Sequence, residues 1–371
     1  MEAQNHLAAL RKKRGLSAPE VAHAVGVSRQ TIYAIEAGSY VPNTLVALRL
    51  ARLLEVLVEE IFLLETETPP ADDLRPATLL PGDEGGGGLL QLCQVDDRLI
   101  AVRPSLTPWV LPAADAILCE VEEDRLEPGK TLVRSFREGS EYGKRLLIAG
   151  CDPAISIVVR HVQKEGVEAV VVGRNSSQSL ALLKQGLIHV AGTHMPESDG
   201  ESLLAGIYKH FAPGAVAVFS YAVWEQGLVL AKGNPKAIHG IQDLARAEIQ
   251  IVNREPGAGS RVFLDTHLHR LGIPASTVQG YGNLATGHLS AARRVQKGEA
   301  DCCIATKAAA SLYGLDFLPL VRERYDFVIQ TKHLDLPGIQ VLLEALGKTA
   351  LRRELQEFGG YDTSLSGARQ E

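Results

Sequence analysis

Two kinds of hydrophobic periodicity divide the chain. Residues 6–56 hold four short segments in which apolar residues recur every three or four positions, the spacing of one helix face. The capping residues Ser17, Ser28 and Asn43 precede the last three segments, and glycine ends the first three. From residue 145, short apolar runs alternate with helical segments, a pattern typical of βαβ units with parallel strands. We therefore predict a helical head and an α/β body.

The region between head and body has its own composition. Residues 66–88 are rich in proline, glycine and acidic residues without periodicity, which predicts a flexible linker. Residues 89–142 contain short apolar runs around a Val-Asp-Asp turn, which predicts a small β-rich connector that lies against the body or begins it. The predicted domains are thus the head (1–65), the linker (66–88), the connector (89–142) and the body (143–371).

Composition narrows the class of protein. The chain has 371 residues, is 46% hydrophobic and carries a net charge of −6. No apolar run approaches the ~20 residues that a membrane span needs, and no secretion signal is visible, so we expect a cytoplasmic protein without a membrane segment. The five cysteines are scattered without a CxxC or Cys/His ligand spacing. We therefore expect no metal site and no cofactor.

Charge is distributed unevenly along the chain. Residues 1–53 carry seven Lys and Arg side chains against three Glu, a net charge of +4 on an acidic protein. A basic module on an acidic chain indicates a polyanionic partner for that module alone.

The head resembles a known DNA-binding family. The segment LRKKRGLSAPEVAHAVGVSRQTIYAIEAGSYVPNTLVALRLARLLEVLVEEIF is similar to phage-repressor-type (Cro/C1, XRE) helix-turn-helix domains. In that family the third helix enters the major groove of operator DNA. The resemblance implies base contacts by Arg29, Gln30 and Tyr33, a phosphate contact by Thr31, and Ser17 and Ser28 at the helix starts. We expect Glu36 to be structural, because an acid facing DNA would be repelled.

Polar residues gather where strands of the body run into helices, positions that we call corners. Ligands of parallel α/β sheets bind at the carboxyl ends of the strands, so these residues are the candidates for a binding site. Hydroxyls, backbone N–H groups and helix N-termini there favour an anion. Arg174, Arg254 and Arg261 are the charged candidates, and we expect at most two of them to face the ligand. Taken alone, residues 253–261 also fit a plain turn followed by a helix cap. The candidates are Asp152, Ser156, Arg174, Asn175, Ser176, Ser177, Arg254, Gly257, Gly259, Ser260, Arg261, His288 and Thr306.

Residues 143–345 carry a second resemblance, strongest in EQGLVLAKGNP and NREPGAGSR. They are similar to periplasmic-binding-protein-like domains of the branch fused to repressor-type heads and to molybdopterin-biosynthesis proteins. The resemblance implies a two-lobed (type II) α/β fold crossed by residues 215–231 and 317–331, with ligand between the lobes. It implies molybdate or tungstate as ligand, with Ser176, Ser177 and Ser260 among the donors. Asp152 places an acid where an oxyanion would sit, which leaves a small organic acid as the alternative.

These observations favour a ligand-responsive, one-component transcriptional regulator. A homodimer would bind two-fold operator DNA through its heads, and a small anionic effector would bind the body. The chain shows no catalytic motif of the common hydrolase, nucleotide-binding or thiol-enzyme types, so we do not expect an enzyme. The alternative is a cytosolic oxyanion-binding or molybdenum-cofactor-related assembly protein that does not regulate DNA.

Overall fold

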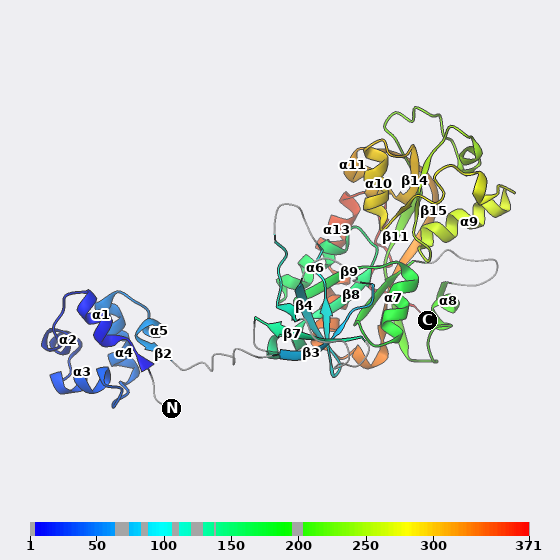
Figure 1. The fold of residues 1–371 in the computed structure, drawn as a ribbon. Coiled ribbons are helices and arrows are strands. Elements are labelled where there is room, and N and C mark those ends of the chain that lie inside the picture. The colour runs from blue at the N-terminus through cyan, green and yellow to red at the C-terminus, as the bar shows by residue number, and fades with distance from the viewer. Residues whose placement is uncertain are drawn as a thin grey trace. The chain divides into compact units, whose positions relative to one another are not determined.

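The computed structural model forms two units, Met1–Asp73 and Leu74–Glu371 (Figure 1). It describes residues 4–63, 74–82, 88–105, 111–119, 129–136, 139–194 and 203–370. Much of the expected linker 66–88 lies outside these residues. Its segment Leu74–Leu79, however, is a strand of the second unit, so this part of the linker prediction is wrong. Among the described residues, no helix is long and apolar enough to cross a bilayer.

The first unit is the predicted helical head. Its helices pack around a core that includes the fully buried side chains of Leu7, Val21, Ile32 and Leu50. Two short strands, β1 and β2, pair beside this core. The elements are β1 (Gln4–Asn5), α1 (Leu7–Lys13), α2 (Ala18–Val25), α3 (Arg29–Glu36), α4 (Thr44–Leu54), α5 (Val58–Ile61) and β2 (Phe62–Leu63).

The second unit begins with a small closed β-barrel, where the sequence predicted a β-rich connector. Its strands follow the order β3-β5-β4-β6-β7, and β4 and β5 form the predicted hairpin. Apolar side chains join the barrel to the body, as where Val95 and Leu147 share one core. A buried ion pair between Arg145 and Asp115 lies at the same seam. The strands are β3 (Leu74–Leu79), β4 (Leu89–Val95), β5 (Arg98–Val102), β6 (Ala116–Cys119) and β7 (Lys130–Ser135).

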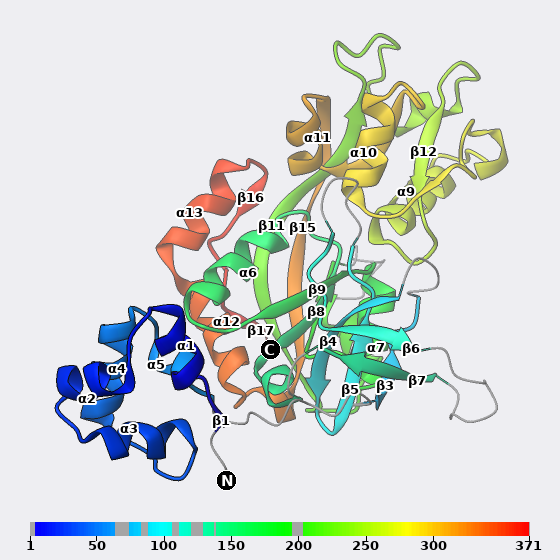
Figure 2. The same cartoon turned by 60° about the vertical axis from the view of Figure 1, so that its left-hand side comes forward.

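One mixed sheet runs through the body and carries both of its lobes. Its order is β13-β12-β14-β11-β15-β10-β8-β9. The long strands β11 (Val216–Leu230) and β15 (Asp316–Gln330) pair antiparallel in the middle and pass from one lobe to the other (Figure 2). They match the predicted crossings at 215–231 and 317–331. The two-lobed α/β fold is therefore confirmed.

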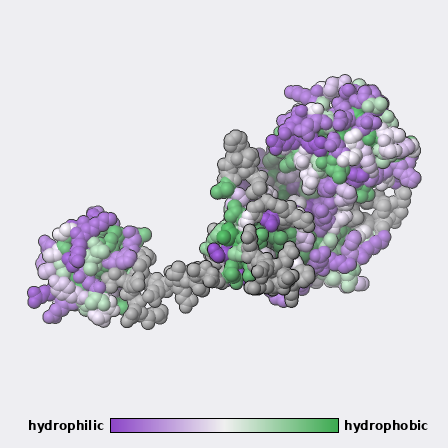
Figure 3. Space-filling view, in the orientation of Figure 1, coloured by the Kyte–Doolittle hydropathy of each residue, from purple (hydrophilic) through white to green (hydrophobic). Residues whose placement is uncertain are grey.

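Each lobe adds parallel strands and helices to these crossing strands. The first lobe holds β8 (Leu146–Gly150), α6 (Ile155–Lys164), β9 (Ala169–Gly173), α7 (Ser176–Lys184), β10 (Val190–Thr193) and α8 (Leu203–Tyr208). The second holds β12 (Ile251–Arg254), α9 (Gly259–Arg270), β13 (Leu284–Ala285), α10 (His288–Gln296), β14 (Cys302–Thr306) and α11 (Lys307–Tyr313). Hydrophilic side chains predominate on the second lobe in the view of Figure 3.

The end of the chain returns to the first lobe. Helices α12 (Pro337–Gly347) and α13 (Thr349–Glu357) pack on α6 and share its core. Strands β16 (Tyr361–Asp362) and β17 (Arg369–Gln370) then pair with β11. Both lobes are thus anchored to the same central pair of strands.

Candidate functional site

The start of α3 has the form expected of a DNA-reading helix. Ser28 caps it, accepting a hydrogen bond from the Thr31 N–H at 3.1 Å. Arg29 and Gln30 are exposed, and Tyr33 is 53% exposed, so all three side chains are available to a partner. Arg and Gln are suited to bidentate contacts with guanine and adenine.

Other residues around this helix are held by internal contacts. Ser17 forms a capping box with Glu20 at the start of α2, so its side chain is already used in the head. Glu36 pairs with Arg11, with 2.6 Å between Oε1 and Nε, and both side chains are 11% exposed. The structure thus places Glu36 in a supporting role, as predicted.

The predicted corners of the two lobes meet in a region that we call the lobe junction. It comprises Asn175, Ser177 and His194 from the first lobe and Pro256, Gly257 and Gly259 from the second.

The contacts across the lobe junction are close. Asn175 Nδ2 donates to the Pro256 carbonyl oxygen at 3.2 Å. Gly257 adopts φ +85°, and a Cβ there would lie 3.4 Å from Ser177 Cβ. A Cβ on Gly259 would lie 2.5 Å from Cε1 of His194, so only glycine fits. The structure therefore brings the predicted corner at Asn175–Ser177 and the predicted corner at Gly257–Gly259 together.

The three candidate arginines have different surroundings, and of these three only Arg254 is almost fully buried near the lobe junction. Arg254 is 2% exposed and pairs with Glu255 at 2.9 Å, while its Nη1 has no hydrogen-bond partner among the described residues. Arg174 instead donates to the carbonyl oxygen of Pro81 at 3.0 Å, beside the barrel. Arg261 pairs with Asp265, lies over the Tyr281 ring and donates to the carbonyl oxygen of Arg254 at 3.1 Å. The structure gives no support for Arg174 and Arg261 as ligand contacts.

The hydroxyl donors transferred from molybdate binders are largely engaged within the protein. Ser176 Oγ donates to the His194 carbonyl oxygen at 2.7 Å, and Ser260 Oγ donates to Gln226 Oε1 at 2.5 Å. Thr306 caps α11 through a 3.4 Å hydrogen bond from the Ala309 N–H. These hydroxyls position the corners, and they are not free donors for an oxyanion.

The first predicted corner differs from the expectation in its details. Helix α6 begins at Ile155, so Asp152 lies in a turn before it, where its Oδ1 accepts from the Ala154 N–H and the Tyr361 hydroxyl. Burial raises the pKa of Asp152 to about 6 against those hydrogen bonds. Ser156 is exposed on α6, which argues against a role in an enclosed ligand site.

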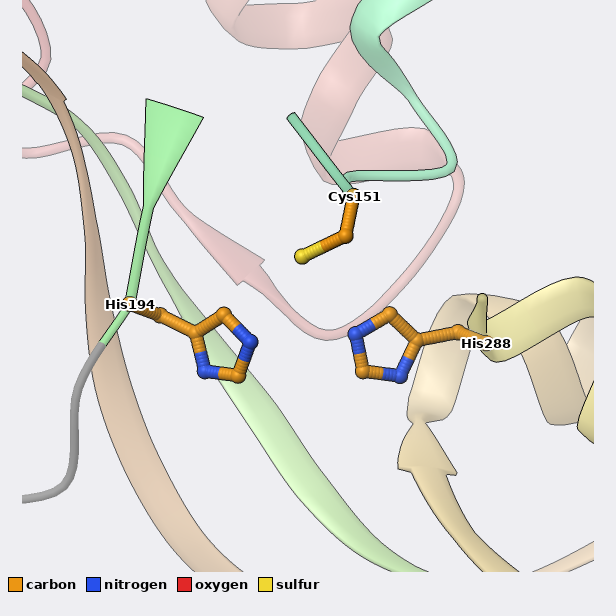
Figure 4. A group of neighbouring side chains, drawn as sticks. All are labelled: Cys151, His194 and His288. Atoms are coloured by element: carbon orange, nitrogen blue, oxygen red, sulfur yellow. The ribbon is translucent and has the colours of Figure 1, made fainter. Parts of the chain in front are cut away.

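Sequence reasoning missed a cluster beside the lobe junction. Cys151, His194 and His288 point toward one another, and one ligand-type atom of each lies within 4.8 Å of the others (Figure 4). Cys151 follows β8, His194 follows β10 and His288 begins α10. No short spacing could reveal three residues on separate corners, although each stands where a strand ends or a helix begins. His288 was predicted as a ligand contact; Cys151 and His194 were not.

The two histidines of this cluster are held differently. Burial opposes protonation of His194, but Cys151 and Glu323 favour it and raise its pKa to about 10. His194 Nδ1 lies 2.9 Å from Glu323 Oε2. His288 is 0% exposed, and neither of its ring nitrogens has a hydrogen-bond partner among the described residues. Burial and the charge of Arg254 lower its pKa well below the usual value, so its imidazole is neutral.

Other buried polar atoms near the cluster also lack partners within the described part of the chain. They include Trp224 Nε1 and Thr193 Oγ1, on residues that are at most 1% exposed. The Trp224 ring centroid lies 4.8 Å from that of His194 and 5.3 Å from that of His288. Buried polar atoms without partners are rare and costly, which makes this place a candidate for a ligand.

A separate hollow of about 420 Å³ lies beside Lys184 and His210, and none of the predicted site residues lines it.

Comparison with known proteins gives the family of each part. A model of the PBP superfamily domain matches residues 159–347, and a helix-turn-helix domain model matches residues 5–63. The chain is 34% identical over 241 residues to the uncharacterized protein YvgK of Bacillus subtilis (strain 168), covering 64% of this chain and 78% of YvgK. It is 41% identical over 64 residues to the uncharacterized HTH-type transcriptional regulator YgzD of the same organism, covering 17% of this chain and 97% of YgzD.

Solved structures similar to this chain include a putative phosphate ABC transporter substrate-binding protein with bound phosphate from Clostridium perfringens. It has a TM-score of 0.44 and 14% identity, with 59% of this chain and 99% of that chain covered. The assignment of the chain to a family is based on the match to the domain model and on the similarity to YvgK. The chain belongs to the PBP superfamily and carries a helix-turn-helix domain ahead of its two-lobed domain.

Proposed function

We propose that this chain is a transcriptional regulator that binds operator DNA through α3 and responds to a small anion bound at the lobe junction. The observation that carries the proposal is the presence, in one chain, of an exposed Arg29–Gln30 helix start and of buried polar atoms near the lobe junction that have no partner among the described residues. The similarity to regulators such as YgzD supports the DNA-binding half.

The chemistry of the junction supports an anionic effector. Arg254 supplies a buried positive group with one free nitrogen, and Trp224 Nε1 is a donor without an acceptor among the described residues. A carboxylate or a tetrahedral oxyanion offers the acceptors that such donors need. Since Ser176 and Ser260 are engaged elsewhere, we place a small carboxylate beside molybdate and tungstate as effector candidates.

Effector binding requires that the lobes part and close again. The side chains of His194, His288 and Ser260 are at most 1% exposed, so the lobes are closed on each other. A ligand that binds only the closed form shifts the balance of the lobes, and coupling to the heads of a homodimer would change operator affinity. Typical couplings of this kind are ~1–3 kcal/mol, or about 5- to 150-fold in affinity.

The proposal is tested by the electrophoretic mobility of DNA from upstream of the chain's own reading frame. The full chain is expected to retard this DNA at ~100 mM salt in preference to scrambled DNA. Arg29→Ala should abolish the preference, whereas Arg14→Ala should keep it, because Arg14 pairs with Glu55 away from α3. Equal binding of both DNAs by the unaltered chain would contradict the proposal of a transcriptional regulator and favour an anion-binding protein of another kind.

A further inference from the structure

The Cys151, His194 and His288 side chains supply ligand atoms of the kinds that borderline and soft metals prefer. A thiolate sulfur and two imidazole nitrogens suit zinc and its neighbours, whereas magnesium and calcium prefer oxygen. The first two residues belong to the first lobe and the third to the second lobe (Figure 4). The cluster therefore spans the lobe junction.

His288 is the residue that the protein alone does not explain. Its imidazole is fully buried, and both nitrogens lack hydrogen-bond partners among the described residues. A plain helix cap would use one of these nitrogens to accept a backbone N–H. A thiol nucleophile with its base would use Cys151, His194 and Glu323 and would leave His288 without a role. A metal ion would give His288 a partner and would use Cys151 and His194 as well.

The surroundings of His194 match those of a metal ligand. Metal-bound histidines usually donate the second ring N–H to a carboxylate, which fixes the ring and its tautomer. His194 Nδ1 faces Glu323 at 2.9 Å, which leaves Nε2 for the cluster. Glu323 is held in turn by Gln226 Nε2 at 3.2 Å, and Gln226 accepts from Ser260. This buried row of hydrogen bonds positions His194 from the second lobe.

We propose that Cys151, His194 and His288 bind one metal ion of the Zn²⁺ class and that this ion bridges the two lobes. A Cys151 thiolate and the Glu323 carboxylate balance its two positive charges, while Arg254 is compensated by Glu255. Ligands of a tetrahedral zinc ion, at about 2.0–2.3 Å from the metal, lie roughly 3.5 Å apart. The ligand atoms, now within 4.8 Å of one another, would have to approach by at most about 1.3 Å to reach this spacing. Three protein ligands leave a fourth position for an outside ligand.

This inference goes beyond DNA regulation and does not depend on it. The metal links β8 and β10 of one lobe to α10 of the other, so its binding favours the closed lobes. It also gives an anionic effector a second point of attachment beside Arg254.

The test is a titration of untagged, chelator-treated full-length protein with Co²⁺, followed by competition with Zn²⁺. We expect one Co²⁺ per chain, with the thiolate-to-cobalt charge-transfer band and the strong visible bands of a tetrahedral site. Cys151→Ser and His288→Gln should each weaken Co²⁺ binding by about 100-fold or more, and Glu323→Gln by about 10- to 100-fold. The matched controls Cys119→Ser and His269→Gln, at a barrel strand and an exposed part of α9, should bind as the unaltered chain does.

His288→Gln is the decisive variant, because the His288 ring makes no hydrogen bond to the described residues whose loss would unfold the chain. Circular dichroism and thermal melting without metal establish that each variant is folded. Absence of a thiolate–cobalt band in the unaltered chain would overturn the proposal. So would Co²⁺ binding that His288→Gln leaves unchanged, since the ion would then not bridge the lobes.

Discussion

Substitution of Gly259 by alanine probes the contact between the lobes most directly. Gly259 opens α9 in the second lobe, and it lies against His194 of the first. An alanine Cβ there would lie 2.5 Å from Cε1 and 2.8 Å from Nδ1 of His194. The ring cannot move away freely, because Glu323 and Trp224 hold it. The methyl group must therefore push the lobes apart.

The size of the effect follows from the cost of overpacking. Adding a methyl group to a packed interior costs about 1–3 kcal/mol. Since opening the lobes relieves this contact, the cost falls on the equilibrium between closed and open lobes rather than on the fold of either lobe. At 1.4 kcal/mol for each factor of ten, the closed form should lose about 5- to 150-fold in relative population.

Hydrogen–deuterium exchange with mass spectrometry measures this shift without a known ligand. Gly259→Ala should speed exchange in peptides covering residues 190–194 and 255–260, where the His194 N–H donates to Ser176 Oγ. Gly282→Ala is the matched control, because a Cβ at Gly282 has no atom of the described residues within 4 Å. Unchanged exchange in Gly259→Ala, with a retained melting temperature, would refute the closed contact that we describe.

Two further substitutions test the supporting electrostatics. Glu36→Gln removes the partly buried pair with Arg11 and should lower the free energy of unfolding of the head by about 2 kcal/mol in denaturant titration. Glu55→Gln, which breaks an exposed pair, should lower it far less. Equal effects would contradict the supporting role of Glu36. Burial and the neighbouring His333 lower the pKa of His189 to about 4, and its Nδ1 accepts from the Leu147 N–H at 3.0 Å. The neutral form of His189 thus contributes roughly 3 kcal/mol of stability above the unfolded pKa of about 6.5, and this contribution is lost as pH falls toward 4. His189→Asn should therefore flatten the decline of the free energy of unfolding between pH 6.5 and 4.5. An unaltered decline would count against this assignment.

Much of the fold could be predicted because local signals and long-range packing agree. The caps at Ser17 and Ser28 mark the head helices, and the resemblance to periplasmic-binding-protein-like domains located the two crossing strands. The linker prediction failed at Leu74–Leu79, because a strand that contains proline and begins after an acidic stretch carries no distinct pattern. Its strand conformation is imposed by pairing with β7 and β5, which only the tertiary structure supplies.

The site was predicted at the level of corners but not at the level of contacts. Sequence order places Asn175 and Gly257 at strand ends, and the general rule for α/β sheets brings those ends together. Whether an arginine faces the junction depends on neighbours far along the chain. Arg174 donates to the Pro81 carbonyl oxygen beside the barrel, and Arg261 pairs with Asp265 within α9. The histidine–cysteine cluster depends on three corners meeting, so no spacing in the sequence discloses it.

The location of the effector is the central claim, and one measurement tests it directly. Thermal melting is followed with molybdate, tungstate, phosphate and small carboxylates for the unaltered chain, Arg254→Gln and Arg174→Gln. An anion at 100 times its dissociation constant should stabilise the unaltered chain by ~2.7 kcal/mol. We predict that Arg254→Gln loses this shift while its melting without anion remains cooperative, and that Arg174→Gln keeps it. A shift retained in Arg254→Gln and lost in Arg174→Gln would place the anion outside the lobe junction and contradict the account.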